Sequence, residues 1–473
     1  VGFASLILSG ILPVMNFGWM MSAGIGVSLF LTFLIFPALL MQMPKVMPNT
    51  SFENRFALTK IFADLTEKYG NKILYLSVFA LIMSVVGISK LTVENSFIDY
   101  FKESTEIYQG MKTIDRQLGG TTPLDIVVNL EHSEDESNNE ENEGNSDLKL
   151  DEEEEEEDEF DAFEEEFEES ASEAQYWFTS DKMDRIEKIH DYLDGLDQTG
   201  KVLSLGTMLK IGRTLNSGKS LDDFMLALLY NELPERFRKI ILDPYVSVEN
   251  NEARFNVRIR DSEPNLRRNE LLNQIKNDLK VKLKIPEEKG HLANMLVLYN
   301  NMLQSLFKSQ ILTLGVVIFS FLIMFIFLFR SITIALIAIF PNVLSIAVVL
   351  GFMGWIGIPL DMMTITIAAI SVGIAVDNTI HYIHRFRHEY NKDRSYLAAM
   401  HRSHESIGYA MYYTSITIII GFSILVLSKF IPSIYFGLLT GLAMLIALIA
   451  ALTILPQLLI VLKPLGSGNQ ERI

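Results

Sequence analysis

The chain has 473 residues, 49% of them apolar, and its mean hydropathy is +0.24. Its formal net charge of −18 comes from one segment, because residues 131–173 hold 24 Asp and Glu against one Lys and the remainder is slightly basic. The chain contains no cysteine, which excludes disulfide bonds and thiol chemistry.

The apolar residues are gathered into blocks long enough to cross a membrane. A bilayer core of about 30 Å needs about 20 apolar residues in a helix. Residues 1–12 are typical of the end of one such block, and Val1 already lies inside it, so we expect this chain to be the C-terminal portion of a longer protein. Further blocks of sufficient length lie at 18–42, 71–89, 309–329, 332–356, 362–382, 407–428 and 435–462.

Basic residues indicate which loops face the cytoplasm. Lys and Arg gather in 43–72 and 385–402, and Arg330 lies in a short turn between two spans. If these are inside, the spans alternate without conflict and the polar segment 91–305 is outside. We therefore divide the chain into the last helices of a first transmembrane repeat, a cytoplasmic linker or interfacial helix, the first helix of a second repeat, an extracytoplasmic domain, a five-helix bundle and a cytoplasmic tail. These segments are 1–42, 43–70, 71–90, 91–305, 306–463 and 464–473.

The extracytoplasmic segment is predicted to be an α+β domain. Strands are expected at 125–130 and 253–260, the second of which alternates apolar and polar residues. The acidic insert 131–173 cannot bury enough apolar surface to fold, so we predict disorder there. A solvated loop is the favoured interpretation of this insert, and a docking site for a basic partner or for divalent cations is the alternative. Helices are expected at 104–118, 181–197 and 265–283.

An internal repeat relates the two ends of the chain. Residues 1–18 match residues 420–437 without gaps, and the match places Pro13 on Pro432 and, farther on, Pro37 on Pro456. Both copies enter the membrane in the same sense, which predicts parallel repeats.

One acidic residue lies deep within a predicted span. Asp377 is eight residues from Arg385, where the helix is expected to leave the membrane, which places the carboxylate about 12 Å inside. A charge there costs at least about 2.5 kcal/mol, so such residues usually face a protein interior and mark ion pathways. His381 lies one turn later on the same face and could pass a proton toward the cytoplasm. Asn378 points elsewhere and could bond to a neighbouring helix, and a purely structural anchor is the alternative role for the carboxylate.

Small and hydroxylated residues surround this position in the sequence. The hydroxyl groups at the start of the next span could meet the Asp377 face or, alternatively, bond within their own helix; they are those of Thr414, Ser415 and Thr417. Four further residues are expected to shape helix packing, the glycines by close approach and the proline by kinking its span. They are Gly373, Gly351, Gly354 and Pro341.

The run SVGIAVDNTIHYIHRFRHEY, residues 371–390, resembles the motif of the fourth and tenth helices of RND superfamily transporters, in the MMPL-type branch. The resemblance covers nearly the whole chain, since that family has two parallel repeats, each with one helix before a large outside domain and five after it. It implies a polytopic α-helical membrane protein with an α+β extracytoplasmic domain. It also implies that Asp377 is the proton-relay acid, whereas the acidic insert departs from the family pattern.

The resemblance implies a proton-driven exporter of lipids or hydrophobic compounds in the cell inner membrane. Its expected partners are the bilayer, a hydrophobic or lipid substrate, and a second copy or a periplasmic protein, with no nucleic acid. The proton gradient replaces any cofactor, no metal site is expected, and the absence of a catalytic triad or phosphate loop indicates no enzyme. A sterol-sensing-like lipid sensor or scaffold without transport is the alternative, and the related protein-export accessory branch ranks third.

Overall fold

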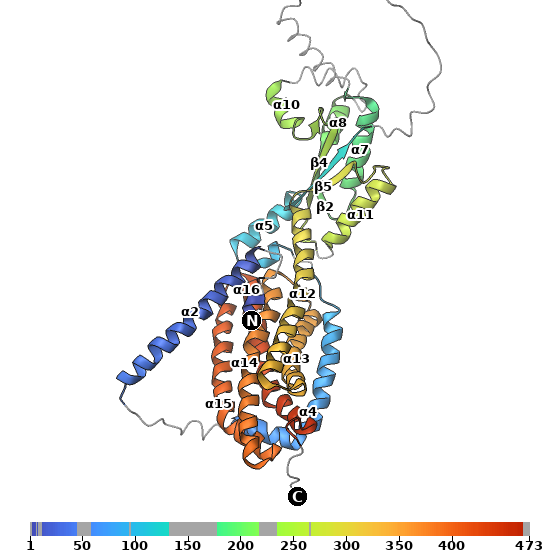
Figure 1. Ribbon diagram of the computed structural model, residues 1–473. Coiled ribbons are helices and arrows are strands. Elements are labelled where there is room, and N and C mark those ends of the chain that lie inside the picture. Colours follow the sequence, from blue (N-terminus) through green and yellow to red (C-terminus); the bar gives the residue numbers. More distant parts are fainter. Residues whose placement is uncertain are drawn as a thin grey trace, which may run out of the picture. The chain divides into compact units, whose positions relative to one another are not determined.

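The computed structural model describes residues 2–5, 7, 12–44, 58–93, 96–131, 177–216, 234–263 and 266–466 (Figure 1). Apart from Glu131, the acidic insert 131–173 lies outside these residues, so its predicted disorder stays a prediction. The chain divides into two units. We call Val1–Asn95, Asp99–Thr105 and Met302–Ile473 the helical unit, and Ser96–Ile98 with Glu106–Asn301 the mixed unit.

The described residues include seven helical segments with the length and hydropathy needed to cross a membrane, which confirms the predicted polytopic fold. Most of them start earlier or end later than the apolar blocks, because polar helical turns extend each span. The elements are α1 (Gly2–Ser5), α2 (Leu12–Gln42), α4 (Leu58–Ile88), α12 (Met295–Phe329), α13 (Ile332–Ile356), α14 (Met362–Asp393), α15 (Tyr396–Ser423), η4 (Ile424–Leu427), α16 (Ile431–Leu452) and α17 (Ile454–Leu462).

Helix α4 joins two predicted segments into one element. Its first three turns lie in the predicted linker 43–70, and non-helical backbone angles at Tyr69 separate them from the apolar span that follows. The linker residues before Leu58 are mostly outside the described part of the chain.

The last predicted span, 435–462, is broken in two at Thr453, which has φ −126° and ψ −59°. The cause is Pro456, three residues later. A proline inside a helix lacks an N–H donor, and its ring clashes with the carbonyl four residues earlier. That carbonyl belongs to Leu452, the last residue of α16. The predicted span is confirmed by the candidate membrane span Ile431–Leu462, which consists of two helices rather than one.

Helix α14 contacts α1, α13, α15 and α16 in the helical unit. It begins with a capping box, in which the Asp361 carboxylate accepts from the backbone N–H groups of Met363 and Thr364 at 2.8 and 2.7 Å. Its inward side chains join one apolar core with residues of α12, α13, α15 and α17. These contacts fix the orientation of α14 about its own axis.

Helices α4 and α13 approach each other through glycines. A Cβ atom added at Gly351 would lie 2.6 Å from Cα of Ser84, and one added at Gly354 would overlap the carbonyl oxygen of Gly87. Gly351 and Gly354 therefore lie where the two helices approach closely, which is the position that a packing role requires. Pro341 is buried within α13, which is helical from Ile332 to Ile356.

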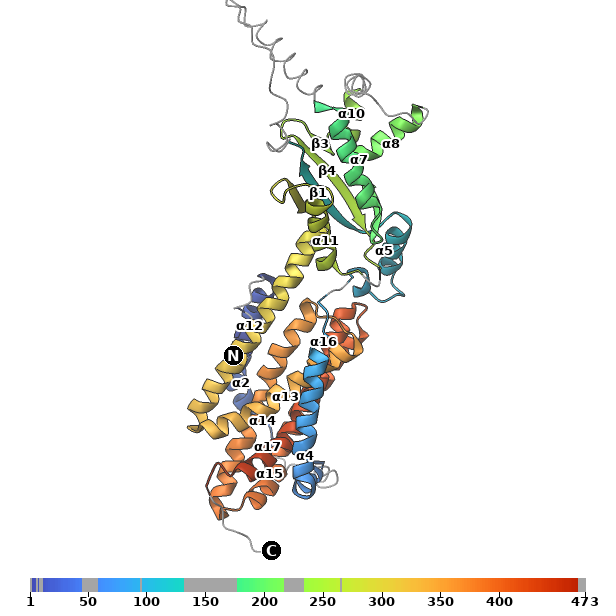
Figure 2. The ribbon, with the colours of Figure 1, turned by 90° about the vertical axis from the view of Figure 1, so that its right-hand side faces the viewer.

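The mixed unit contains a small antiparallel sheet with strand order β2-β4-β1-β5, to which β3 adds by pairing with β4 (Figure 2). All predicted strands and helices of this unit are present. The strands are β1 (Thr122–Asn129), β2 (Thr199–Leu203), β3 (Val246–Ser247), β4 (Glu252–Ile259) and β5 (Gly290–Ala293), and the helices are α5 (Glu106–Gln117), α7 (Ser180–Asp194), α8 (Leu205–Leu215), α10 (Glu235–Ile241) and α11 (Arg268–Val281).

One face of this sheet is apolar and the other is polar. Ile126 pairs with Phe255, and both are buried in a core shared with α7 and α11. On the other face the Asp125 carboxylate accepts from Arg254 at 2.7 Å, Asn256 at 2.7 Å and Asn294 at 2.8 Å. This alternation is the period of a strand covered on one side, so the predicted α+β class is confirmed.

Candidate functional site

Helix α14 carries two opposite faces over residues 377–382. On the outward face, Nε2 of His381 lies 3.2 Å from Oδ1 of Asp377, as expected for two side chains one helical turn apart. Their side chains are 58% and 61% exposed, respectively. We expected a protein interior around Asp377, but the described residues of this chain do not provide it. The physical reason is that α13 and α15 contact α14 through Thr379 and Asn378, which lie on the other face of the helix.

The inward face is held by polar contacts to two neighbouring helices. Asn378 is buried and its amide donates to Oγ of Ser415 on α15 at 3.1 Å, which confirms the expected bond to a neighbouring helix. Thr379 accepts from Asn342 of α13 at 3.1 Å. These contacts fix the rotation of α14, and that rotation sends Asp377 and His381 outward. Gly373 precedes them and is half-buried.

The three predicted hydroxyl-bearing residues of α15 have different hydrogen-bond partners. Ser415 contacts Asn378 rather than Asp377. Thr414 and Thr417 are exposed and donate to the carbonyl oxygens four residues earlier, at 2.7 and 2.8 Å. Of the two alternatives for these threonines, the structure shows the second, a bond within their own helix.

A second polar group lies one turn further along the buried face. Tyr382 is fully buried, and its hydroxyl lies 3.2 Å from Nδ1 of His404 on α15. The same Nδ1 lies 2.9 Å from the carbonyl oxygen of Met400, and Nε2 lies 2.8 Å from that of Leu452. A carbonyl only accepts, so a neutral ring donates to Leu452 and accepts from Tyr382, whereas a protonated ring donates to both carbonyls. The contact with Leu452 therefore requires a hydrogen on Nε2.

The last turns of α14 gather charge around one buried carboxylate. The side chain of Glu389 is 1% exposed and contacts Arg385 at 2.8 Å, Lys392 at 2.7 Å and Arg402 at 2.8 Å. Arg402 also contacts Asp393 at 2.8 Å. Since Arg402 belongs to α15, this network connects the end of α14 to the beginning of the next helix.

Sequence reasoning missed His404 and Glu389. The run around Glu389 carries basic residues at i−4 and i+3, a spacing that could have indicated a neutralised buried acid. The sequence around His404 gives no comparable signal. Its acceptor is the main-chain carbonyl of Leu452, which has no helical donor because of Pro456, 52 positions later in the chain.

The opposite end of α14 holds a further acid. Burial raises the pKa of Asp361 above its ordinary value, against the opposing effect of its hydrogen bonds with Thr364 and Met363. The carboxylate caps the helix and is 2% exposed, which indicates a structural role.

Comparison with known proteins finds a family match that includes these helices. The model of the MMPL family matches residues 237–470, which include α12 to α17 and the end of the mixed unit. Over 154 residues the chain is 29% identical to a membrane protein of Methanocaldococcus jannaschii, and this match covers 33% of the chain and 40% of that relative. The chain thus matches well under two thirds of the relative's length.

Proposed function

Because residues 237–470 form an MMPL family domain, we propose that this multi-pass membrane protein is part of a proton-driven exporter. It would move lipids or other hydrophobic compounds across or out of the inner membrane, with the mixed unit on the extracytoplasmic side. The family supports a membrane transporter or a related lipid-associated protein. The driving force, the substrate class and the sidedness are our proposal.

The contact between Asp377 and His381 supports proton coupling most strongly. Both side chains project from the outward face of α14, inside a segment that is long and apolar enough to cross the membrane. A carboxyl and an imidazole 3.2 Å apart can exchange a proton directly. The buried face of α14 is held by neutral hydrogen bonds to α13 and α15, so the outward pair can change its charge without losing those contacts.

Charge on the outward face would decide what α14 can pack against. An ionised carboxylate within a membrane costs about 2.5–3.5 kcal/mol unless a partner compensates it, whereas the protonated form is neutral. Proton uptake at Asp377 would therefore favour apolar neighbours, and proton release would favour polar or basic ones. We propose that this alternation couples the gradient to movement of the substrate.

The direct test is reconstitution of the full-length protein in vesicles that contain a fluorescent lipid. We expect export of that lipid when a proton gradient is imposed and its loss when an uncoupler dissipates the gradient. Saturable lipid binding with no gradient-dependent movement would contradict the proposal and would favour the alternative, a lipid sensor that shares the fold.

A further inference from the structure

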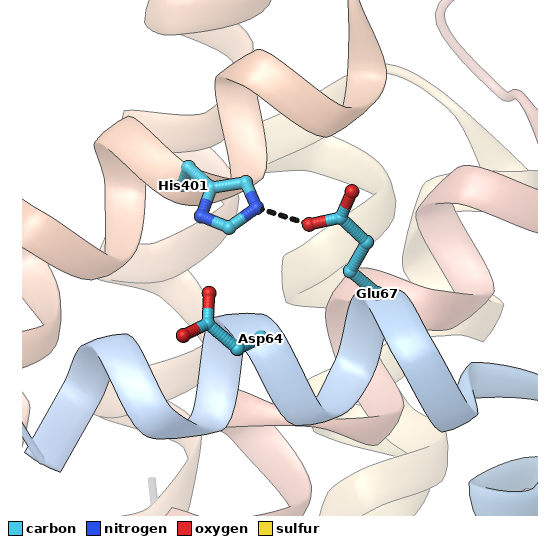
Figure 3. A group of neighbouring side chains, drawn as sticks. All are labelled: Asp64, Glu67 and His401. Carbon is cyan, nitrogen blue, oxygen red and sulfur yellow. Dashed lines mark hydrogen bonds and ion pairs between the residues drawn. The ribbon is translucent and has the colours of Figure 1, made fainter. Parts of the chain in front are cut away.

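We propose that Asp64, Glu67 and His401 form a binding site for one transition-metal ion, of the Zn²⁺ or Mn²⁺ class, that links α4 to α15. Each residue offers one ligand atom, and these atoms all lie within 4.8 Å of one another. Figure 3 shows the carboxylates of Asp64 and Glu67 on α4 turned toward the imidazole of His401 on α15. This site is independent of the proposed transport function.

The helices that carry the ligands are held together by buried contacts of their own. Ala63 of α4 lies in the main core of the bundle. The hydroxyl of Thr66 donates to Phe62 at 2.8 Å and approaches the Leu452 carbonyl at 3.5 Å. A Cβ added at Gly408 would lie 3.3 Å from Cβ of Thr59, so α15 approaches α4 closely. The ligands are therefore brought together by the fold rather than by their own attraction.

The side-chain geometry needs little change to accept a metal ion. Oε2 of Glu67 lies 2.7 Å from Nε2 of His401, and a metal ion would replace the hydrogen bond between them. Asp64 precedes Glu67 by three residues, which places the two carboxylates on one face of α4. Tetrahedral ligands at about 2.1 Å from zinc are about 3.4 Å apart. Modest rotation of the exposed Asp64 side chain closes the remaining distance, and water completes the coordination.

The donor set favours a transition metal over Mg²⁺ or Ca²⁺. Imidazole nitrogen binds Zn²⁺ and related ions well, whereas Mg²⁺ and Ca²⁺ prefer oxygen ligands alone. Lys60 and Lys68 lie one turn to either side of Asp64 on α4 and weaken any purely electrostatic attraction for cations. Binding must therefore come from coordination. The sequence alone gives no sign of the site, since Glu67 and His401 are 334 residues apart.

The test uses the full chain in detergent, stripped with a chelator and titrated with Zn²⁺ by calorimetry. We expect one Zn²⁺ site, whose affinity falls by about tenfold or more in His401→Gln and in Glu67→Gln. Loss of a residue that only supports a metal ligand commonly lowers the affinity by this much, and loss of the ligand itself should have at least the same effect. Exposed Glu405 on α15 provides a matched control, because Glu405→Gln removes the same charge one turn from His401 and should leave the affinity unchanged.

A second measurement separates the site from binding by the acidic insert 131–173, which is identical in every variant. Zn²⁺ should slow hydrogen exchange in residues 58–69 of α4 in the wild-type chain and in Glu405→Gln, and not in His401→Gln. Equal affinity and equal protection in wild type and His401→Gln would overturn the proposal, and so would the absence of any Zn²⁺ site. In that case Glu67 and His401 form only an interhelical hydrogen bond.

Discussion

Nε2 of His404 lies 2.8 Å from the carbonyl oxygen of Leu452, the acceptor that Pro456 leaves without a helical donor. A buried carbonyl without a partner is costly, and within a membrane no water replaces the missing bond. The imidazole of α15 therefore compensates a break in the last predicted span. Thr66 of α4 approaches the same oxygen at 3.5 Å, so three helical segments meet at this point.

Replacement of His404 by Leu should destabilise the helical unit. The change leaves the Leu452 carbonyl and the Tyr382 hydroxyl without their imidazole partner, and an unsatisfied buried polar group costs about 1–3 kcal/mol. Denaturant titration in detergent micelles measures the loss. His384→Leu on the exposed face of α14 is the control and should change stability little. Equal stability of the two variants would show that the Leu452 contact contributes nothing.

The close approach of α4 and α13 gives a second prediction. Gly354→Ala places a Cβ against the Gly87 carbonyl, and such overpacking typically costs about 1–3 kcal/mol. Gly315→Ala in α12 is a matched control, because no atom lies within 4 Å of its added Cβ. The control should be neutral or gain up to about 1 kcal/mol from helix propensity. Thermal unfolding of both variants decides the matter, and a Gly354→Ala protein as stable as the control would refute the contact.

Loss of the Glu389 charge should loosen the end of α14. Glu389→Gln retains the shape of the side chain but leaves Arg385, Lys392 and Arg402 without their shared carboxylate. These cations are partly exposed, so we expect a loss of about 1–3 kcal/mol rather than the larger cost of a fully buried pair. Glu405→Gln makes the same charge change at an exposed position. Hydrogen exchange over residues 385–402 should rise in the first variant and not in the second.

The mixed unit should lose stability as the pH falls below about 6.5. Burial, followed by the charge of Lys210, lowers the pKa of His190 below its ordinary value of 6.5. As the pH falls, the unfolded chain therefore binds a proton before the folded chain does, and stability decreases by at most about 1.4 kcal/mol per pH unit. His190→Asn can keep an acceptor near Oγ of Ser204, which lies 2.9 Å from Nδ1, and should flatten this dependence.

Buried Trp177 reports on this unit, since its indole donates to Oδ1 of Asn251 at 2.7 Å. Its fluorescence can be isolated by Trp19→Phe and Trp355→Phe in the full chain.

A second decline in stability of the mixed unit is expected in stronger acid. Burial alone would raise the pKa of Asp115, but hydrogen bonds from Ser262, Thr121 and Asp261 outweigh it and hold the pKa below 3.8. If stability depends on pH between 5 and 6.5 as steeply in His190→Asn as in the wild type, the assignment of the first decline to His190 is contradicted.

Sequence periodicity predicted the elements well because each depends on local pattern. The alternation of Phe255, Val257 and Ile259 predicted β4, and long apolar runs predicted the spans. The sequence also indicated that Asn378 bonds to a neighbouring helix, because successive residues of a helix are about 100° apart and Asn378 therefore points away from Asp377. What local pattern could not supply was the pairing between distant segments. The contact between Leu452 and His404 and the group around His401 depend on tertiary packing alone.

The exposure of Asp377 in the described part of the chain has a related cause. Insertion energetics predict that a membrane carboxylate faces protein, but they do not say which segment covers it. In the described part of this chain, α15 and α13 contact the side of α14 that carries Asn378 and Thr379, and Asp377 remains exposed. The sequence also left two alternatives open for the hydroxyl groups of Thr414 and Thr417, because the choice between a bond within the helix and a bond across helices depends on rotation of α15.

The central claim is that protonation of Asp377 drives export, and lipid efflux from vesicles that carry full-length Asp377→Asn protein tests it most directly. The change is nearly isosteric, and the side chain is 61% exposed, so the fold should survive while the titrating group is lost. Asp377→Glu retains a carboxyl group and is the matched control. We predict that Asp377→Asn abolishes gradient-driven efflux and still binds lipid, that Asp377→Glu retains efflux in part, and that His381→Ala slows it less severely. Normal efflux by Asp377→Asn, with normal sensitivity to an uncoupler, would contradict the account.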